Sequence, residues 1–334
     1  MPNINDFGTA PDGTAVKRII LERGDLRAQV ITWGASLQAL YRRGADHSLV
    51  LGADDFGSYL GPMRYFGAIV GRVANRIAGG TAVIDGQRYA FDQNERDCTT
   101  LHGGRSGTGS CNWVLEGATD SSCTLSLVLR DGQDGFPGAL RLTALYELDG
   151  QGGVTVSMTG QCDVPTLCNL AHHAYWNLDG APTTADHLMQ VPAKHYLAVD
   201  ELQIPKGPPQ PVQGTRFDFQ KPRVINNPDE PILDHNFCFE TAQPDAVLCR
   251  LSAGGLMMTV HSDQPGLQVY DASGMNTAPQ AGLGGIAYGP HAGIAIEPQH
   301  WPDAPNRPDF EQVTLLPGET YRQTSRFHFA EGGL

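Results

Sequence analysis

The chain has 334 residues and a formal net charge of -13 at pH 7, from 23 lysines and arginines against 36 aspartates and glutamates. This acidic balance argues against nucleic acid and anionic membrane as partners, because both bind proteins through basic surfaces. No apolar run approaches the roughly 18 residues that a membrane-spanning helix needs, and the N-terminus lacks the basic start and apolar stretch of a secretory signal.

Alternating apolar residues predict half-buried β-strands in the middle and at the end of the chain. The alternation is clearest in TLSLVLR (124–130), LRLTALYEL (140–148) and VTVSMT (154–159), and YRQTSRFHF (321–329) repeats it more weakly. Turn pairs at the spacing of antiparallel hairpins are Asp85-Gly86, Asp149-Gly150 and Pro317-Gly318. With 40 glycines and 23 prolines, and no segment of convincing helical period, the chain has little room for long helices.

These patterns predict an all-β fold. An all-β chain hides its strand edges by closing or stacking its sheets, so we expect a large antiparallel β-sandwich of about twenty or more strands. The proline-rich segment 201–231 fits either an interdomain linker or a surface excursion. Similar patterning on both sides of it favours the excursion, and we therefore expect a single domain over residues 1–334.

Several segments combine polar side chains with apolar strand neighbours. In chain order they supply Asn75 and Arg76 in GRVANRIAGG, His102 in LHGG, His172, His173, Tyr175 and Trp176 in LAHHAYWNLDG, Asp234 and His235 in LDHNFCF, and Glu297 and His300 in EPQHWPDAPNRPDF. Taken singly, each has an ordinary structural role as an alternative: a surface ion pair, a turn residue or a cap. Adjacent strand residues point to opposite faces, so at most one of His172 and His173 serves a given site.

Glu297 raises a sharper question, because it directly follows the apolar run HAGIAI (291–296) and precedes a proline-rich stretch. Either its carboxylate ends a strand in water, or the chain is built to hold one carboxylate still. Glu297 and His300 have a metal-ligand spacing, but Pro298 and Pro302 argue against the helix that would bring them onto one face. We therefore expect no metal.

Other chemistries lack their sequence signatures. No G-x-S-x-G elbow supports a serine nucleophile, and the glycines of GRVANRIAGG form neither a phosphate loop nor a dinucleotide fingerprint. The 7 cysteines are scattered without a C-x-x-C pair, which disfavours a disulfide scaffold or zinc ribbon and indicates a reducing, cytoplasmic setting. What remains is acid–base chemistry without a metal or cofactor, with histidine and glutamate as the titrating groups.

The motifs, in this order, resemble those of the aldose 1-epimerases, also called galactose mutarotases. The resemblance rests on GRVANRI, LHGG, HHAYWNL, LDHNFCF, GLQVYD and EPQHWPDAPN, with VITWGASLQAL and LVLGADDFGSYL upstream. It covers the chain from about residue 20 to the C-terminus and implies a β-supersandwich, a free monosaccharide substrate, and no metal or organic cofactor.

The resemblance also assigns roles by position. It implies that His173 is the proton donor, at the ring oxygen, and that Glu297 is the base, at O1, with the prolines restricting the backbone around it. The sugar contacts that it implies are Asn75, Arg76, His102, Tyr175, Asp234 and Gln268. Trp176 or Trp301 could offer an apolar face to the sugar, but a core position is favoured for both.

The chain departs from the family pattern near the expected sugar pocket. His172 stands where asparagine is usual, Trp176 where phenylalanine is usual, RSGTGSCNW follows LHGG, and YDASG replaces Tyr-Thr-Gly-Asn. These changes leave the identity of the sugar open. Three other activities also remain open: a hexose-6-phosphate 1-epimerase, which would need converging cations, a non-catalytic sugar-binding protein of this fold, and a glycoside hydrolase using Asp234 with Glu297.

Overall fold

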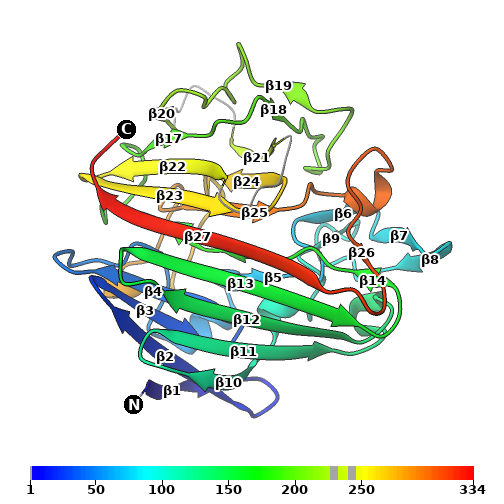
Figure 1. Ribbon diagram of the computed structural model, residues 1–334, viewed down its shortest axis with the longest axis horizontal. Helices are drawn as coiled ribbons and strands as arrows, with labels where there is room; N and C mark the ends of the chain where they lie inside the picture. The colour runs from blue at the N-terminus through cyan, green and yellow to red at the C-terminus, as the bar shows by residue number, and fades with distance from the viewer. Residues whose placement is uncertain (1, 226–231, 240–245) are drawn as a thin grey trace.

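The computed structural model describes residues 2–225, 232–239 and 246–334 and is drawn in Figure 1. Within these ranges the regular structure consists of strands and five short 3-10 turns, without an α-helix. The turns are η1 (Phe56–Leu60), η2 (Thr108–Ser110), η3 (Gln133–Gly135), η4 (Leu283–Gly285) and η5 (Ala304–Asn306). No helix of this part of the chain is long and apolar enough to cross a membrane. The expected all-β class is thus confirmed.

A nine-stranded antiparallel sheet forms the broad layer that runs across Figure 1. Its order is β10 (Val114–Ala118), β11 (Ser122–Leu129), β12 (Leu140–Leu148), β13 (Gly153–Cys162), β27 (Tyr321–Glu331), β23 (Leu256–Ser262), β22 (Val247–Ala253), β17 (Leu188–Gln190) and β20 (Arg223–Val224). The strongest alternating segments of the sequence are therefore neighbours in one sheet.

Two smaller sheets lie against the nine-stranded one. A four-stranded sheet contains β1 (Asn3–Thr9), β2 (Ala15–Arg23), β3 (Leu26–Ile31) and β4 (Ser36–Arg42). A six-stranded sheet has the order β16 (Tyr175–Trp176), β25 (Ile294–Gln299), β24 (Gly266–Tyr270), β21 (Asp234–Cys238), β18 (His195–Tyr196) and β19 (Gln210–Pro211). The proline-rich segment thus supplies β19 to this sheet and β20 to the nine-stranded one, while residues 226–231 lie outside the described residues.

Four short antiparallel pairs complete the fold. They are β5 (Ala68–Val70) with β15 (Ala171–His173), β6 (Arg76–Ala78) with β9 (Thr99–Leu101), β7 (Thr81–Ile84) with β8 (Gln87–Ala90), and β14 (Thr166–Leu167) with β26 (Thr314–Leu315). The predicted turn pairs fall where expected: Asp85-Gly86 joins β7 to β8, with both residues at positive φ as a tight hairpin requires.

The main core lies between the nine-stranded sheet and the two smaller ones. Apolar side chains of β12 and β13 pack in one cluster with those of β2 to β4 and of β24 and β25. In β12 the residues predicted to face inward, from Leu140 to Leu148 in alternation, are all buried. The Tyr146 hydroxyl ties the layers together by donating to the Ala35 carbonyl, 2.6 Å away. Burying these alternating faces is the main force that holds the sandwich together.

Candidate active site

A cavity of about 320 Å³ opens where β15, β16, β21, β24 and β25 meet the β6–β9 pair. This volume lies in the range of small-molecule sites, about 300–1,000 Å³. The predicted residues that line it are Asn75, Arg76, His102, His173, Tyr175, Asp234 and Glu297. Gln268 does not line it but lies directly behind, where its side-chain amide donates to the Asp234 carboxylate. Segments far apart in the sequence therefore converge on one cavity.

His173 reaches the cavity because β15 alternates its side chains. His172 points the other way, toward Tyr146 and Phe327, with ring centroids 5.9 and 5.7 Å away. The His173 ring lies among aromatic neighbours on the cavity side, 5.0 Å from Tyr175 and 5.1 Å from His102. The structure thus separates the two histidines onto opposite faces, as strand geometry dictates.

Glu297 lies inside β25 rather than at a strand end in water. Its residue is 2% exposed, and β25 is paired with β16 on one side and β24 on the other. Ile296 and Ile294 are also fully buried, so the carboxylate lies beside the core. Pro298 follows within the strand, where its carbonyl accepts a hydrogen bond from the Gln323 amide at 2.8 Å. The β24 strand pairs with Glu297 itself, through Gln268, and β16 pairs with Ile294 and Ala295 just before it, so the sheet fixes the backbone that carries the carboxylate.

The two titrating groups meet in the cavity: His173 Nε2 is 3.7 Å from Glu297 Oε1. Burial lowers the pKa of His173 to about 4. Burial, and then the nearby charge of Asp234, raise the pKa of Glu297 well above 4.5, and Arg76 only partly opposes them. In this environment the charged form of each group is costly, so the pair is suited to share a single proton.

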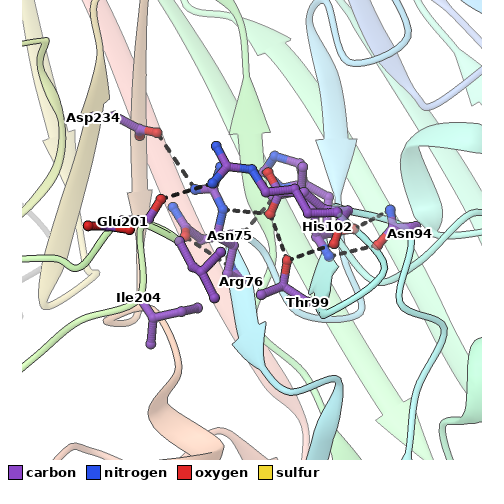
Figure 2. A network of polar contacts seen from close by, with 12 residues as sticks. Asn75, Arg76, Asn94, Thr99, His102, Glu201, Ile204 and Asp234 are labelled. Atoms are coloured by element: carbon purple, nitrogen blue, oxygen red, sulfur yellow. Dashed lines mark hydrogen bonds and ion pairs between the residues drawn. The ribbon is translucent and has the colours of Figure 1, made fainter.

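Arg76 carries the charge that organises one wall of the cavity. Its Nε and one terminal nitrogen donate to the two carboxylate oxygens of Glu95, at 2.7 and 2.8 Å. The other terminal nitrogen faces Asp234 at 3.6 Å. Figure 2 shows this guanidinium between Asp234 on one side and Thr99 on the other. The fork-to-fork pairing fixes the orientation of Arg76 before any ligand arrives.

Two hydrogen bonds, each donated by a backbone N–H, join Asn75 and His102. The Asn75 N–H donates to His102 Nδ1 at 3.2 Å, and the His102 N–H donates to the Asn75 carbonyl at 2.9 Å. Because Nδ1 accepts, the neutral ring carries its proton on Nε2. Burial, followed by the charges of His173 and Arg76, keeps the pKa of His102 well below 6.5. His102 is thus a neutral hydrogen-bond donor beside the acid–base pair.

The structure adds residues that sequence reasoning missed. Glu95 holds Arg76 without lining the cavity, and further lining residues are Tyr65, Arg96, Leu101, Gln203, Ile232, Tyr270, Ser273 and Gly274. Tyr65 stacks on His173 with ring centroids 6.1 Å apart and an interplanar angle of 29°. Leu101, in LHGG, and Tyr270, in GLQVYD, lie within motifs, and Ser273 and Gly274 belong to the YDASG segment that departs from the family pattern. No motif marks Tyr65, Glu95, Arg96, Gln203 or Ile232.

The two tryptophans considered as sugar platforms lie elsewhere. Trp176 is fully buried and packs on Phe327, with ring centroids 4.7 Å apart, so it belongs to the core. The Trp301 indole donates to the Pro265 carbonyl at 2.9 Å and does not line the cavity. The core alternative therefore holds for Trp176.

Two further candidate histidines, His235 and His300, do not line the cavity. His235 packs against Phe217, with ring centroids 4.3 Å apart. The His300 backbone is tied to the Asn169 side chain, whose Oδ1 accepts its N–H at 3.0 Å. His300 therefore does not join Glu297, and no group of three or more histidine, cysteine or acidic side chains in the described part of the chain has metal-binding geometry.

Comparison with known proteins gives one consistent answer. The family model described as aldose 1-epimerase matches residues 17–328. Galactose mutarotases of Rattus norvegicus and Homo sapiens are each 37% identical to this chain. Each alignment runs over 336 positions and covers 97% of this chain and 97% of the mutarotase. Aldose 1-epimerase of Escherichia coli is 29% identical, with 96% of this chain and 97% of that protein covered.

Solved structures agree with the sequence matches. An aldose epimerase homologue from C. elegans superposes with a TM-score of 0.90 at 29% identity, covering 96% of this chain and 100% of that one. Galactose 1-epimerase from Lactobacillus acidophilus gives a TM-score of 0.85 at 27% identity, with 99% of each chain covered.

Proposed function

Because the chain belongs to the aldose 1-epimerase family, it interconverts the α and β anomers of an aldose, and we propose that His173 and Glu297 are the acid and the base of this reaction. The observation that carries this assignment is the 3.7 Å approach of His173 Nε2 to Glu297 Oε1 inside a buried cavity. No other histidine–carboxylate pair among the described residues lines this cavity at such a distance.

The reaction needs two coordinated proton transfers. Glu297 takes the proton from the hydroxyl on C1 while His173 gives a proton to the ring oxygen, and the C1–O5 bond breaks to leave the open-chain aldehyde. Rotation about C1–C2 presents the opposite face of the carbonyl. Closure then reverses both transfers: O5 attacks C1, His173 recovers its proton and Glu297 returns a proton to O1.

The shared proton fits this cycle. With one proton on the pair, the charged arrangement has imidazolium and carboxylate, and the neutral arrangement has imidazole and carboxylic acid. The first is the state before ring opening and the second is the state that ring opening produces. Burial favours the neutral arrangement of both groups, as the directions of their pKa shifts indicate, so the cavity favours the products of the opening step.

The remaining lining residues are suited to hold the sugar. We assign ring-hydroxyl contacts to Asn75, Arg76, His102, Tyr175 and Asp234, with Gln268 acting on Asp234 through its hydrogen bond. His102 and Arg76 offer donors, and Asp234 offers an acceptor, whose pKa is raised by burial against the opposing charge of Arg76. Holding the hydroxyls in this way places O1 and O5 between the two titrating groups.

Anomerisation of freshly dissolved pure anomers tests the assignment. A positioned acid or base contributes about 10² to 10⁴ in rate, so Glu297→Gln and His173→Asn are each expected to lose about that factor in polarimetric assays. His328→Asn is the matched control for the histidine and is expected to keep wild-type activity, because His328 lies on β27, the middle strand of the nine-stranded sheet, and does not line the cavity. Near-normal activity in either cavity variant would remove that residue from its role.

We also infer that residues 1–334 act as one domain in a reducing, cytoplasmic setting. The proline-rich segment pairs with both large sheets, which supports the first inference. All seven cysteines are free thiols, which supports the second.

A further inference from the structure

Glu95 binds Arg76 from behind the cavity lining, at shorter distances than Asp234 does. Its two carboxylate oxygens accept from Arg76 at 2.7 and 2.8 Å, and Oε2 also accepts from the Thr99 hydroxyl at 2.8 Å. The side chain of Glu95 is 19% exposed and that of Arg76 is 12% exposed, so both charges are largely removed from water. Neither proton transfer of the proposed reaction uses Glu95.

The loop that carries Glu95 is built to place it. Glu95 and Thr99 form an isolated antiparallel bridge that closes the turn through Arg96 and Asp97, both at positive φ. The Asn94 side chain makes two further hydrogen bonds across the loop. Its amide donates to the Leu101 carbonyl, and its Oδ1 accepts the Leu101 N–H at 2.8 Å. Leu101 pairs in turn with Arg76 across the β6–β9 ladder. Figure 2 shows Asn94 and Thr99 on the side of Arg76 that faces away from Asp234.

This pairing sets the charge that a substrate meets. Arg76 faces Glu95 on one edge and Asp234, 3.6 Å away, on the other, and Glu297 lines the same cavity. The other arginine on the lining, Arg96, donates to the Glu201 carbonyl at 2.9 Å at the exposed rim. With Glu95 counted behind Arg76, the site holds three carboxyl groups, those of Glu95, Asp234 and Glu297, against the two guanidinium groups of Arg76 and Arg96.

An arginine whose fork is free is a preferred partner of carboxylates and phosphates, because its parallel N–H groups match their paired oxygens. In Arg76 this fork is already filled by Glu95. The nitrogen that remains can donate to a single oxygen, which suits a hydroxyl group. We propose that Glu95 is a specificity-determining residue, which holds Arg76 in position and cancels its charge so that the site selects neutral aldoses over anionic ones.

This inference rests on the proposed function, and it is tested by comparing two sugars that differ only at C6, where one is neutral and the other is charged. An aldohexose and the corresponding hexuronate carry CH₂OH and carboxylate at C6, and anomerisation of both is followed by polarimetry. In wild type we expect the aldohexose to have the higher kcat/KM. In Glu95→Gln we expect kcat/KM for the aldohexose to fall roughly 10- to 100-fold, the size expected for loss of charge-assisted hydrogen bonds.

The ratio of the two kcat/KM values is the diagnostic quantity. Glu95→Gln is expected to shift it at least about tenfold toward the hexuronate, as removal of one full charge beside the substrate implies. Asp92→Asn is the matched control: Asp92 lies on the same loop and pairs with Arg105, not with Arg76, so it makes the same change in net charge and leaves the ratio unchanged. An unchanged ratio in Glu95→Gln, or an equal shift in Asp92→Asn, would overturn the proposal.

Glu95→Asp separates charge from position and keeps the test decisive if the glutamine variant does not fold. The shorter carboxylate retains the charge but loses the two-point grip on Arg76. We expect kcat/KM to fall by the same factor for both sugars, with their ratio unchanged. Wild-type rates in Glu95→Asp contradict a positioning role. Failure of the wild-type enzyme to anomerise any aldose, in contrast, would contradict the proposed function itself.

Discussion

His173 Nε2 lies 3.7 Å from Glu297 Oε1, at a place where two strands from distant parts of the chain, β15 and β25, bring an imidazole and a carboxyl group together out of water. Burial acts on the two groups in opposite directions, lowering the pKa of His173 to about 4 and raising that of Glu297. We therefore expect the two groups to titrate as a coupled pair.

The first prediction concerns the free protein at neutral pH. Because burial lowers the pKa of His173, its ring is expected to be neutral from pH 7 down to about 4. NMR of the imidazole carbons, assigned with the His173→Asn variant, checks this directly. Titration of His173 near the ordinary value of 6.5 would contradict the expected effect of burial.

The second prediction concerns stability. The pKa of Glu297 in the folded state lies above its ordinary value of 4.5, so between these values the folded protein binds more protons than the unfolded protein. Wild-type stability contributed by this group therefore falls as pH rises above 4.5. Glutamine does not titrate, so Glu297→Gln is expected to gain about 0.5–2 kcal/mol in unfolding free energy at pH 8 relative to pH 5.

Denaturant unfolding of wild type and Glu297→Gln at the two pH values measures this difference. Glu116→Gln, on the exposed face of β10, is the control for the loss of a surface carboxylate. A Glu297→Gln variant whose stability relative to wild type is the same at both pH values would show that the carboxylate is not strained by burial.

The fold was predictable where long strands alternate. In β12 the residues from Leu140 to Leu148 follow the inward and outward pattern read from the sequence, because one face packs on the core and the other meets solvent. Strands of two or three residues, such as β16 and β19, carry no measurable period, so their places in the six-stranded sheet were not predictable. Their pairing depends on distant partners.

The residues of the site were predictable where they lie within motifs of the family. His173 and Glu297 were identified through the family resemblance, whereas physical reasoning alone left the choice between His172 and His173 open. Glu95 had no such signal, because its contact with Arg76 arises from the hairpin that folds residues 94–101 back onto β6. Trp176 lies in the core, the position that the sequence favoured over a sugar platform.

The third prediction follows from the opposite orientations of His172 and His173. Neither ring nitrogen of His172 has a hydrogen-bond partner in the described part of the chain, and the ring packs between Tyr146 and Phe327. We expect His172→Asn to keep anomerisation within roughly threefold of wild type, because adjacent strand residues face opposite sides of a sheet. Polarimetry beside His173→Asn checks this, and equal losses in both variants would show that the wrong histidine was assigned.

Asp271 underlies the last prediction, because it joins two parts of the cavity rim. Its carboxylate accepts the Leu233 N–H at 2.8 Å and the Ser273 N–H at 3.0 Å. Leu233 precedes Asp234, and Ser273 lines the cavity within the segment that departs from the family pattern. Asp271 is 3% exposed and does not line the cavity, so it acts as a positioning residue for both groups.

Asp271→Asn keeps the shape of this side chain but turns one acceptor into a donor that faces a backbone N–H. One of the two rim contacts is then lost, and a hydrogen bond to a charged group is worth about 1.5–3 kcal/mol. Because sugar contacts move while His173 and Glu297 do not, we expect KM to rise about tenfold or more with kcat nearly unchanged. Asp149→Asn is the control, since Asp149 caps the β12–β13 turn through Gln151 and Gly153 and lines no part of the cavity. A fall in kcat at constant KM, or the same KM change in Asp149→Asn, would mean that Asp271 supports the fold in general and not the grip on the sugar.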